Sequence, residues 1–455
     1  MAEENFDRLG LNCNHFDYVR FTFADICGTA RGKILPKKSV VKFLPDKLEL
    51  YAGTFAYGSN HVVPFEILER DVGTIGHGNA KLVPIPETFH TIPWSNEKEE
   101  GPKVAEVYCE PYWIETNTPQ PAPRNLATSM LKKLDDMGLE VLSATEYEFK
   151  IYKDSNTANR VPIFPDTEFG SIVRFSLLED LIFYLDQNMQ KVGMNFDNFS
   201  CEYSPGQFEL VMDPMKGIET ADKGFLFKHG VTEMILKKGY GLSFLAKPDN
   251  IPGGGNGAHF NFSIWDKKTG KNAFYDADAS DNLSSFARHW IAGFIKHAPA
   301  LTALCSPTIN CYRRVHQPWA PNIADWNYDD RMVLLRVKNA NEKSTYMENR
   351  LPSSIANPYI IMAATIAAGL DGVKHKMSPP PTRDSAAPKL PSSLAEALDI
   401  LEADTALTEV LGEDFVRYFV GIKREIELKQ YGHHDISKFI PEELEAEIKG
   451  YEISL

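Results

Sequence analysis

Two glutamates separated by a single residue lie within the segment Ser143–Phe149, which is otherwise mostly apolar or aromatic. Side chains at positions i and i+2 of a strand share a face, so Glu146 and Glu148 would project together while Tyr147 and Phe149 pack behind them. Two carboxylates this close need cations between them. The pair therefore predicts a metal site on a sheet.

A second pair of glutamates, Glu202 and Glu209, flanks the dipeptide Pro205-Gly206. Their odd separation would place them on opposite faces of a straight strand. A bend at Pro205-Gly206 could return both side chains to one site.

A Gly-rich stretch, residues 252–257, runs into an alternating strand that carries His259 and Asn261 on one face. The glycines allow backbone to approach a ligand, and the strand presents the imidazole. Further along, Glu348 and Arg350 repeat the i, i+2 spacing with a carboxylate and a guanidinium. The stretch lacks the Gly-Lys-Ser/Thr ending of a P-loop, and nothing marks it as a dinucleotide-binding turn.

Five arginines are interleaved with these acidic and imidazole groups: Arg313, Arg314, Arg331, Arg336 and Arg350. In an acidic chain, guanidinium groups near site carboxylates suit bidentate binding of phosphate and carboxylate. Each feature alone has a structural explanation, such as a solvated strand face or a surface ion pair. Their combination favours a binding site.

Length, composition and charge limit the class of protein that could carry this site. The chain has 455 residues, of which 43% are apolar, which is enough for two folded domains. Its net charge of −14 argues against a nucleic-acid or anionic-membrane partner. The acidic start and the lack of an apolar run near ~18 residues predict a cytoplasmic protein without a membrane span.

The N-terminal part shows β-type alternation over Tyr18–Ala24 and a Gly-rich turn over Cys27–Gly32. Prolines in Thr118–Pro123 mark a linker, after which Asn125 could cap a helix that runs to about Met137. We therefore expect domains at residues 1–117 and 124–455, joined by a linker at residues 118–123.

Beyond residue 140, short strand candidates alternate with long helical segments such as Asn282–Ala298 and Pro358–Val373. This pattern predicts an α+β domain. The segment Met377–Pro388 is too rich in proline for regular structure and should form an exposed loop.

Taken in order, these motifs resemble the glutamine synthetase family, in its bacterial-type, type I-like branch, over most of the chain. The resemblance rests on the Glu-x-Glu strand, the Gly-rich loop with His259, and the segments Phe21–Gly28, Pro205–Glu209, Ser306–Arg314, Arg350–Tyr359 and Leu390–Leu398. It implies an N-terminal β-grasp-like domain, an α+β catalytic domain, and a homo-oligomer whose sites lie between neighbouring subunits. The expected assembly is a dodecamer of two stacked hexameric rings.

The resemblance also implies a reaction. ATP activates the γ-carboxylate of glutamate as γ-glutamyl phosphate, which an amine then attacks, while two to three Mg²⁺ or Mn²⁺ ions neutralise phosphates and carboxylates. The expected partners are glutamate, ATP and a small amine.

Residue by residue, the resemblance assigns the first metal site to Glu148, Glu202 and Glu209, and the second to Glu146, His259 and Glu348. Substrate binding falls to Arg314, Arg350, Gly255 and Glu148, with Arg313 competing for the place of Arg314. ATP binding falls to Asn261, Ser263, Arg336 and Lys343. Catalytic roles fall to Arg331, Arg350 and Glu348.

Four positions depart from the family pattern. Ala52 stands where an aspartate binds ammonium, and Trp319 where an acidic residue shields it, so ammonium should bind poorly and a larger, less charged amine could fit. Asn261 replaces a histidine, and Tyr346 replaces an arginine near the triphosphate. These two changes predict altered or lost ATP binding.

Three functional hypotheses follow. The first is an ATP-dependent ligase that makes a γ-glutamyl amide from an amine other than ammonia. The second is a non-catalytic scaffold assembly resembling lengsin, the glutamine synthetase-like protein of the vertebrate lens, and the third is a genuine glutamine synthetase. Competent ligands at all six metal positions place the ligase first.

Overall fold

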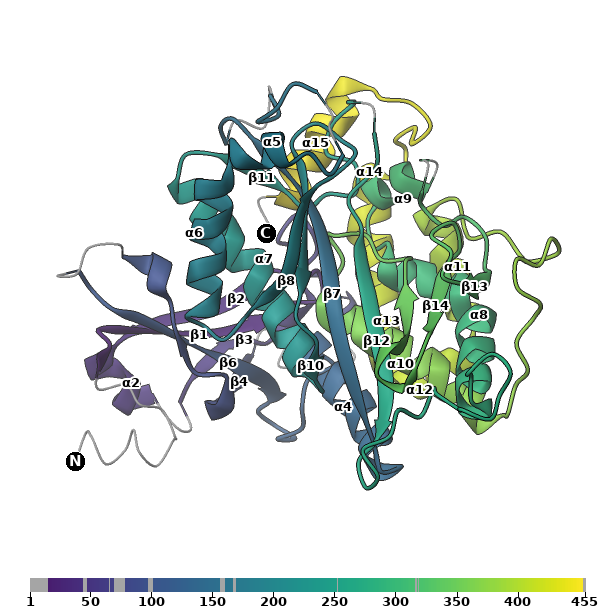
Figure 1. Ribbon diagram of the computed structural model, residues 1–455. Helices are drawn as coiled ribbons and strands as arrows, with labels where there is room; N and C mark the ends of the chain where they lie inside the picture. The colour runs from purple at the N-terminus through teal and green to yellow at the C-terminus, as the bar shows by residue number, and fades with distance from the viewer. Residues whose placement is uncertain are drawn as a thin grey trace.

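The structure is a computed structural model that describes residues 15–43, 47–64, 66–68, 78–96, 101–155, 160–166, 169–251, 253–315, 317 and 319–452. Two β-sheets organise these residues. Figure 1 shows the N-terminal sheet at one side of the molecule and the long strand β7 (Leu139–Tyr152) of the second sheet near its middle. Helices α8 (Ser285–Cys305) and α11 (Leu394–Ala403) lie on the far side of β12 (Ala258–Asp266) and β14 (Leu335–Asn339).

The N-terminal sheet has six strands in the order β2-β1-β6-β4-β3, with β5 paired to β6. Its strands are β1 (Tyr18–Ala24), β2 (Ala30–Pro36), β3 (Glu49–Tyr51), β4 (Asn79–Pro84), β5 (His90–Thr91) and β6 (Val104–Trp113). Pairs are antiparallel except β1 with β6. Val19, Phe21 and Phe23 of β1 face the core, as the alternation predicts.

The second sheet has nine strands in the order β13-β14-β15-β12-β7-β9-β8, with β10 and β11 also paired to β7. Its strands are β7 (Leu139–Tyr152), β8 (Phe196–Cys201), β9 (Gln207–Met212), β10 (Met215–Lys216), β11 (Gly241–Ser243), β12 (Ala258–Asp266), β13 (Trp326–Tyr328), β14 (Leu335–Asn339) and β15 (Thr345–Asn349). β13 and β14 are parallel, and the other pairs are antiparallel.

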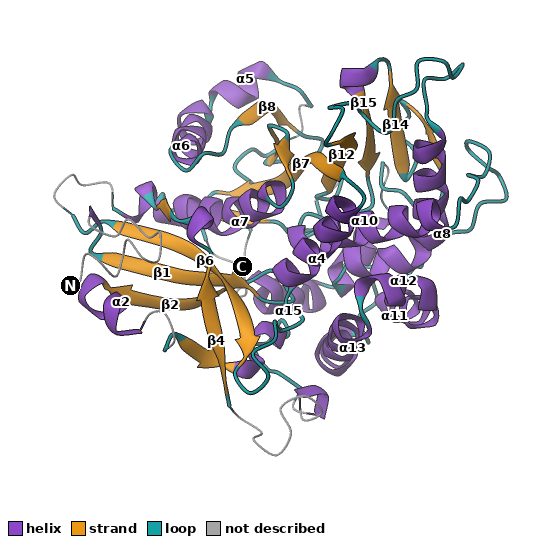
Figure 2. Ribbon diagram, turned by 90° about the horizontal axis from the view of Figure 1, so that it is seen from below, coloured by secondary structure: helices purple, strands orange, loops and turns teal. Residues whose placement is uncertain are grey.

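Helices cover one face of the second sheet. Figure 2 shows α7 (Glu219–Lys237), α4 (Pro123–Asp136), α10 (Pro358–Lys374) and α8 (Ser285–Cys305) in a row beneath it. The ring of Tyr147 on β7 stacks on Phe227 of α7, with ring centroids 5.0 Å apart. Because this aromatic side is filled by helices, the opposite side of β7, which carries the two glutamates, remains open for a site.

The remaining helices frame the sheets. They are α2 (Lys37–Phe43), α5 (Ile172–Ser176), α6 (Glu179–Gln190), α9 (Ile309–Val315), α11 (Leu394–Ala403), α12 (Thr405–Leu411), α13 (Glu413–Ile422), α14 (Lys429–Tyr431) and α15 (Pro441–Glu452). Short 3-10 turns occur at η2 (Ala52–Ala56), η4 (Pro86–Thr88), η5 (Pro93–Ser95) and η6 (Glu342–Ser344), and η7 (Lys423–Leu428) is a π-helix. Within the described residues, no helix combines the length and apolar character needed to cross a membrane.

The α+β class is confirmed, as are a helix near each of the two predicted segments and the irregular loop at 377–388. Helix α8 begins at Ser285, where the Ser284 side chain caps it, and runs through Pro299 to Cys305. The N-terminal β-grasp likeness, the ring and the domain boundary at residues 118–123 stay predictions.

One local prediction was wrong, and another was right in kind but not in extent. Asn125 does not cap helix α4: the helix begins at Pro123, whose missing N–H costs nothing at that position, and the Asn125 amide donates to Gln120 O at 2.9 Å. The turn predicted at Cys27–Gly32 is shorter, because β2 begins at Ala30 and Gly32 already pairs with Thr22. Gly32 lies so close to the backbone of Phe21 that a side chain would collide with it.

Candidate functional site

Strand register assembles the first four predicted ligands. In the β7–β9 pair Glu148 lies directly opposite Glu209, and in the β7–β12 pair Glu146 lies directly opposite His259. Directly opposed residues of an antiparallel pair place their side chains on the same face. All four side chains therefore gather on the face of the sheet away from α7, where they line one cavity.

A hairpin brings in Glu202. Strands β8 and β9 are joined by a turn in which Gly206 has φ +69 and Glu202 N donates to Gln207 O at 2.9 Å. The positive φ favours glycine at this position. The predicted bend at Pro205-Gly206 is confirmed, and Glu202 lines the same cavity as Glu209.

Glu348 of β15 joins the group through His259. The Nδ1 atom of His259 lies 3.3 Å from Glu348 Oε1 and 3.4 Å from Glu146 Oε2. Arg336 Nη1 donates to Glu348 Oε2 at 3.0 Å, and Arg350 Nη1 forms a close ion pair with Glu348 Oε1. The carboxylate of Glu348 is thus shared between the imidazole and two guanidinium groups.

The donor set suits a hard divalent cation. One ligand atom each from Glu146, Glu209 and His259 lie within 4.8 Å of one another. Several carboxylates with a single imidazole are the ligands expected for Mg²⁺ or Mn²⁺ rather than for a thiolate-bound metal. Glu148 and Glu202 line the same cavity, so the residues present fit more than one ion.

Crowding of these half-buried carboxylates shifts their pKa values. Burial, followed by the charge of Glu148, raises the pKa of Glu202 to about 7. Burial, with Glu146 and Glu148, raises the pKa of Glu209 to about 8. A cation placed among these groups would remove the repulsion that raises both values.

At His259 and Glu348, neighbouring groups of opposite charge stabilise the charged forms. Burial and Arg350 lower the pKa of His259, but hydrogen bonds from the imidazole to the carboxylates of Glu146 and Glu348 outweigh them and raise it to about 9. Burial alone would raise the pKa of Glu348, yet His259, Arg350 and Arg336 together hold it far below its usual range. Glu348 therefore stays ionised at neutral pH.

Arginines and glycines form another wall of this cavity, whose volume is about 440 Å³. Arg314, Arg331 and Arg350 line it together with Gly254 and Gly255. The backbone at Gly255 packs so closely that a Cβ there would lie 2.5 Å from Ala246 O and 2.9 Å from Arg314 Cγ. The wall therefore combines guanidinium groups with exposed backbone, which can bind a carboxylate.

Arg314, and not Arg313, faces the cavity. Arg314 Nη1 donates to Leu351 O at 3.2 Å. Arg313 points the other way into a buried ion pair, in which its Nη2 lies 2.7 Å from Glu447 Oε1 of α15. The competing assignment of Arg313 to the substrate therefore does not fit the structure.

The predicted nucleotide-binding residues are only partly brought together. Asn261 lies beside the cluster and donates from Nδ2 to Glu146 Oε1 at 2.8 Å. Ser263 is buried, and its hydroxyl accepts a hydrogen bond from Trp265 Nε1 at 2.8 Å, while Lys343 is exposed on η6. None of Asn261, Ser263 and Lys343 lines the cavity. Five of the six predicted metal ligands do line it, and the sixth, Glu348, does not.

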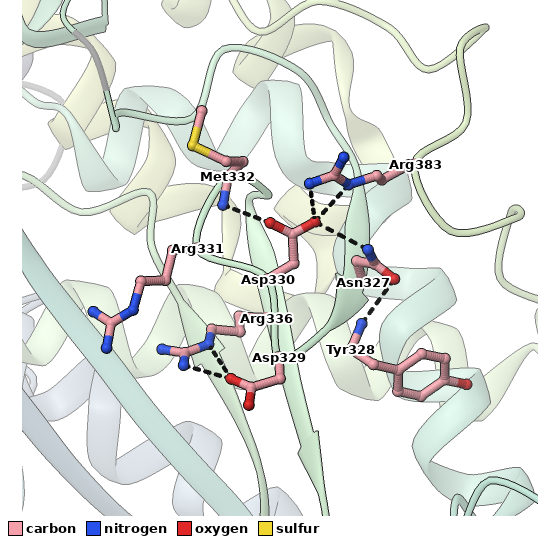
Figure 3. Close-up of a pocket in the computed structure, with 8 residues that line it drawn as sticks. All are labelled: Asn327, Tyr328, Asp329, Asp330, Arg331, Met332, Arg336 and Arg383. Atoms are coloured by element: carbon pink, nitrogen blue, oxygen red, sulfur yellow. Dashed lines mark hydrogen bonds and ion pairs between the residues drawn. The ribbon is translucent and has the colours of Figure 1, made fainter.

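A second, open pocket of about 750 Å³ adjoins the first. Figure 3 shows Arg336 paired with Asp329, and Arg383 paired with Asp330. Arg331 lines both pockets, and in Figure 3 its guanidinium extends away from these two aspartates. Arg331 is therefore positioned to reach a group that spans the two pockets.

The comparisons with known proteins fit this geometry. Residues 120–440 match the family model "Glutamine synthetase, catalytic domain". This chain belongs to the glutamine synthetase family. Members of the glutamine synthetase family are ATP-dependent ligases that make carbon–nitrogen bonds, and they generally use Mg²⁺ or Mn²⁺.

Individual relatives in the glutamine synthetase family differ in kind. Lengsin of Rattus norvegicus is 31% identical over 431 residues, covering 90% of this chain and 72% of that protein. Glutamine synthetase of Pyrococcus abyssi is 30% identical over 443 residues, covering 94% of this chain and 93% of that protein. The solved complex of GmaS with ADP is 25% identical with a TM-score of 0.80, covering 97% of both chains.

Two residues at which this chain departs from the glutamine synthetase pattern lie in different places. Trp319 lines the cavity beside Arg314. Ala52 is buried at the start of η2, directly after strand β3 of the N-terminal sheet. It does not line the cavity of its own chain. The proposed role of position 52 in an amine pocket would therefore require a neighbouring subunit.

Sequence reasoning missed other residues near the site. Gln207 Nε2 donates to Asn256 Oδ1 at 2.9 Å and lies 3.3 Å from Glu148 Oε2, which fixes the Gly-rich loop against the carboxylate. Phe169 and Tyr203 line the cavity next to Trp319. The i, i+2 rule gave no signal for Phe169, whereas Tyr203 could have been found from its position directly after Glu202.

Proposed function

We propose that this protein is an ATP-dependent ligase that activates the γ-carboxylate of glutamate and transfers the γ-glutamyl group to an amine other than ammonia. The observation that carries the proposal is the gathering of Glu146, Glu148, Glu202, Glu209 and His259 with three arginines around one cavity. A scaffold needs no such arrangement of mutually repelling carboxylates.

Each group has a role in this proposal. Two to three Mg²⁺ or Mn²⁺ ions held by the six ligands would neutralise the phosphates and the carboxylate that react. Arg314 and Arg350 would hold the glutamate carboxylate, with the backbone of Gly255 against it, and Arg331 and Arg336 would face the phosphates. Arg331, Arg350 and Glu348 would act at the reacting carbonyl, where charge develops.

The lining of the cavity supports an amine larger than ammonia. Trp319 supplies an apolar surface where an ammonium ion would need a carboxylate. Among relatives, GmaS is a gamma-glutamylmethylamide synthetase, so a structural neighbour joins glutamate to an organic amine. A less charged acceptor therefore suits this chain better than ammonium does.

Lys338 supports retention of ATP binding. The family arginine that precedes the metal glutamate is Tyr346 here, but Tyr346 lies directly opposite Lys338 in the β14–β15 pair. Two residues away on each strand, Arg336 lies directly opposite Glu348, so all four side chains share a face. Lys338 can therefore return a positive charge to the region that Tyr346 leaves without one.

The alternative is a catalytically inactive scaffold resembling lengsin. The identity with rat lengsin and the departures at Asn261 and Tyr346 favour it. A genuine glutamine synthetase is the second alternative, and Trp319 weighs against it. For any of the three, we propose a cytoplasmic homo-oligomer, a dodecamer of two hexameric rings, with a β-grasp-like domain over residues 1–117.

Phosphate release from ATP, measured with Mg²⁺ or Mn²⁺ and glutamate, tests the proposal. The screen should cover ammonium, methylamine, ethanolamine, polyamines and aromatic amines, with the product mass determined. Amine-dependent phosphate release together with a γ-glutamyl amide is the expected result. No turnover with any amine, and no heat of ATP binding by calorimetry, would favour the scaffold instead. Turnover with ammonium above all other amines would indicate a genuine glutamine synthetase.

A further inference from the structure

Three aromatic side chains from distant parts of the chain form a stack at the rim of the cavity. The rings of Phe169 and Tyr203 have centroids 4.6 Å apart and planes 19° apart, and those of Tyr203 and Trp319 are 6.1 Å and 22° apart. We call Phe169, Tyr203 and Trp319 the aromatic ledge. All three line the cavity that holds the metal-ligand cluster.

The aromatic ledge is fixed in place yet open. Gly170 N donates to Cys201 O at 3.0 Å, which pins the segment that carries Phe169 to the hairpin that carries Tyr203. Even so, Phe169, Tyr203 and Trp319 are 56%, 44% and 49% exposed. Large aromatic surface left exposed beside a polar cavity is typical of a site that binds a flat apolar group.

Charge around the aromatic ledge argues against a second ammonium group in its ligand. Every carboxylate that lines the cavity, namely Glu146, Glu148, Glu202 and Glu209, belongs to the proposed metal-ligand set. The other charged lining residues are arginines and His259. A polyamine would thus bring its distal cation towards carboxylates that metal ions already neutralise and towards guanidinium groups that repel it.

We propose that the amine acceptor of this enzyme is a primary amine with a neutral aromatic substituent, an arylalkylamine, whose ring packs on the aromatic ledge. This inference rests on the proposed ligase function and names its substrate class. In the transfer step the neutral amine nitrogen forms a C–N bond with the γ-carbonyl carbon, and the acyl C–O bond to phosphate breaks. The phosphate leaves with the bonding electrons and takes the proton that the nitrogen loses.

The test compares 2-phenylethylamine, methylamine and putrescine as acceptors in the wild-type protein and in Trp319→Ala and Tyr203→Ala. We expect kcat/KM for 2-phenylethylamine to exceed that for the other two amines. Because aromatic pairs contribute about 0.5–1.5 kcal/mol beyond burial, each variant should lower this value by about 2-fold to 13-fold and leave the KM for ATP and glutamate unchanged. The matched control is Phe183→Ala, an exposed aromatic of α6 that does not line the cavity.

The outcomes separate the two proposals. Turnover of methylamine or putrescine at least as efficient as that of 2-phenylethylamine would overturn the aromatic acceptor and leave the ligase function intact. So would unchanged kinetics in both variants. Binding of 2-phenylethylamine by calorimetry without turnover of any amine would overturn the ligase function, and with it the acceptor role of the aromatic ledge.

Discussion

Lys338 of β14 and Tyr346 of β15 are direct partners across two antiparallel strands, two residues along from the partnered Arg336 and Glu348. Lys338 also forms an ion pair with Asp329, which Arg336 shares. A lysine therefore stands beside the tyrosine that occupies the place of a family arginine. This relationship bears on whether the protein still uses ATP.

Replacing Lys338 tests that relationship. If Lys338 contacts the triphosphate, Lys338→Met removes a charge-assisted hydrogen bond of about 1.5–3 kcal/mol and should raise the Kd for ATP by about 10-fold or more, measured by calorimetry. The control is Lys374→Met, a lysine 59% exposed at the end of α10. Equal ATP affinity in wild type and Lys338→Met would show that Lys338 pairs with Asp329 and does not contact ATP.

Much of the site could be predicted from the sequence because strand geometry is local. The alternation around Glu146 and Glu148 fixed which residues face outwards, and the Pro205-Gly206 turn fixed how Glu202 returns. These inferences need only the two-residue period of a strand and the φ preferences of proline and glycine.

The parts that sequence reasoning missed depend on contacts between distant segments. Arg313 and Arg314 are adjacent on one helix, and the choice between them is made by Glu447, which lies on α15. Ser263 is an exception, because it accepts from the indole of Trp265 only two residues away, a local contact that motif order does not reveal. The aromatic ledge joins three segments that share no periodic pattern.

Metal binding should stabilise the folded protein through the carboxylate cluster. We expect MnCl₂ at about 100 times its Kd to add about 2.7 kcal/mol to the free energy of unfolding, with a matching rise in Tm. Glu209→Gln should lose most of that rise, whereas Glu409→Gln, on an exposed carboxylate of α12, should keep it. A full rise in Tm for Glu209→Gln would exclude Glu209 as a ligand.

The contact between the N-terminal sheet and α7 should make stability depend on pH. Buried Glu106 lies 3.0 Å from His229 Nε2 and 3.3 Å from His90 Nε2. Burial opposes both charges, but the histidines hold the pKa of Glu106 well below its usual 4.5, and Glu106 raises the pKa of His229 above 6.5. The contribution of Glu106 is therefore present above pH 4.5 and lost as pH falls further, through its folded pKa. That of His229 is present below pH 6.5 and lost as pH rises through its folded pKa.

Glu106→Gln should consequently destabilise the protein most between pH 4.5 and 6.5. We expect a loss of about 3 kcal/mol at pH 5.5, since breaking a buried pair leaves an uncompensated charge, and a smaller loss at pH 9, because rising pH removes the proton from His229. Urea unfolding at the two pH values measures the difference, with Glu409→Gln as the control. A loss of equal size at pH 5.5 and pH 9 would show that the ion pair contributes no pH-dependent stability.

Two neighbouring glycines of the Gly-rich loop allow a matched test of whether Arg314 binds glutamate. Both Gly254 and Gly255 line the cavity, but a Cβ at Gly254 meets nothing within 4 Å, whereas one at Gly255 collides with Ala246 O and with the side chain of Arg314. Gly255→Ala should displace Arg314 and lower kcat/KM for glutamate by about 10-fold to 100-fold, since small displacements of positioning groups cost that much. Gly254→Ala should stay close to wild type. The two variants are matched because both add the same methyl group to the same loop. Equal kinetics in the two would mean that Arg314 does not hold the glutamate. Binding of the glutamate carboxylate would then fall to Arg350 alone.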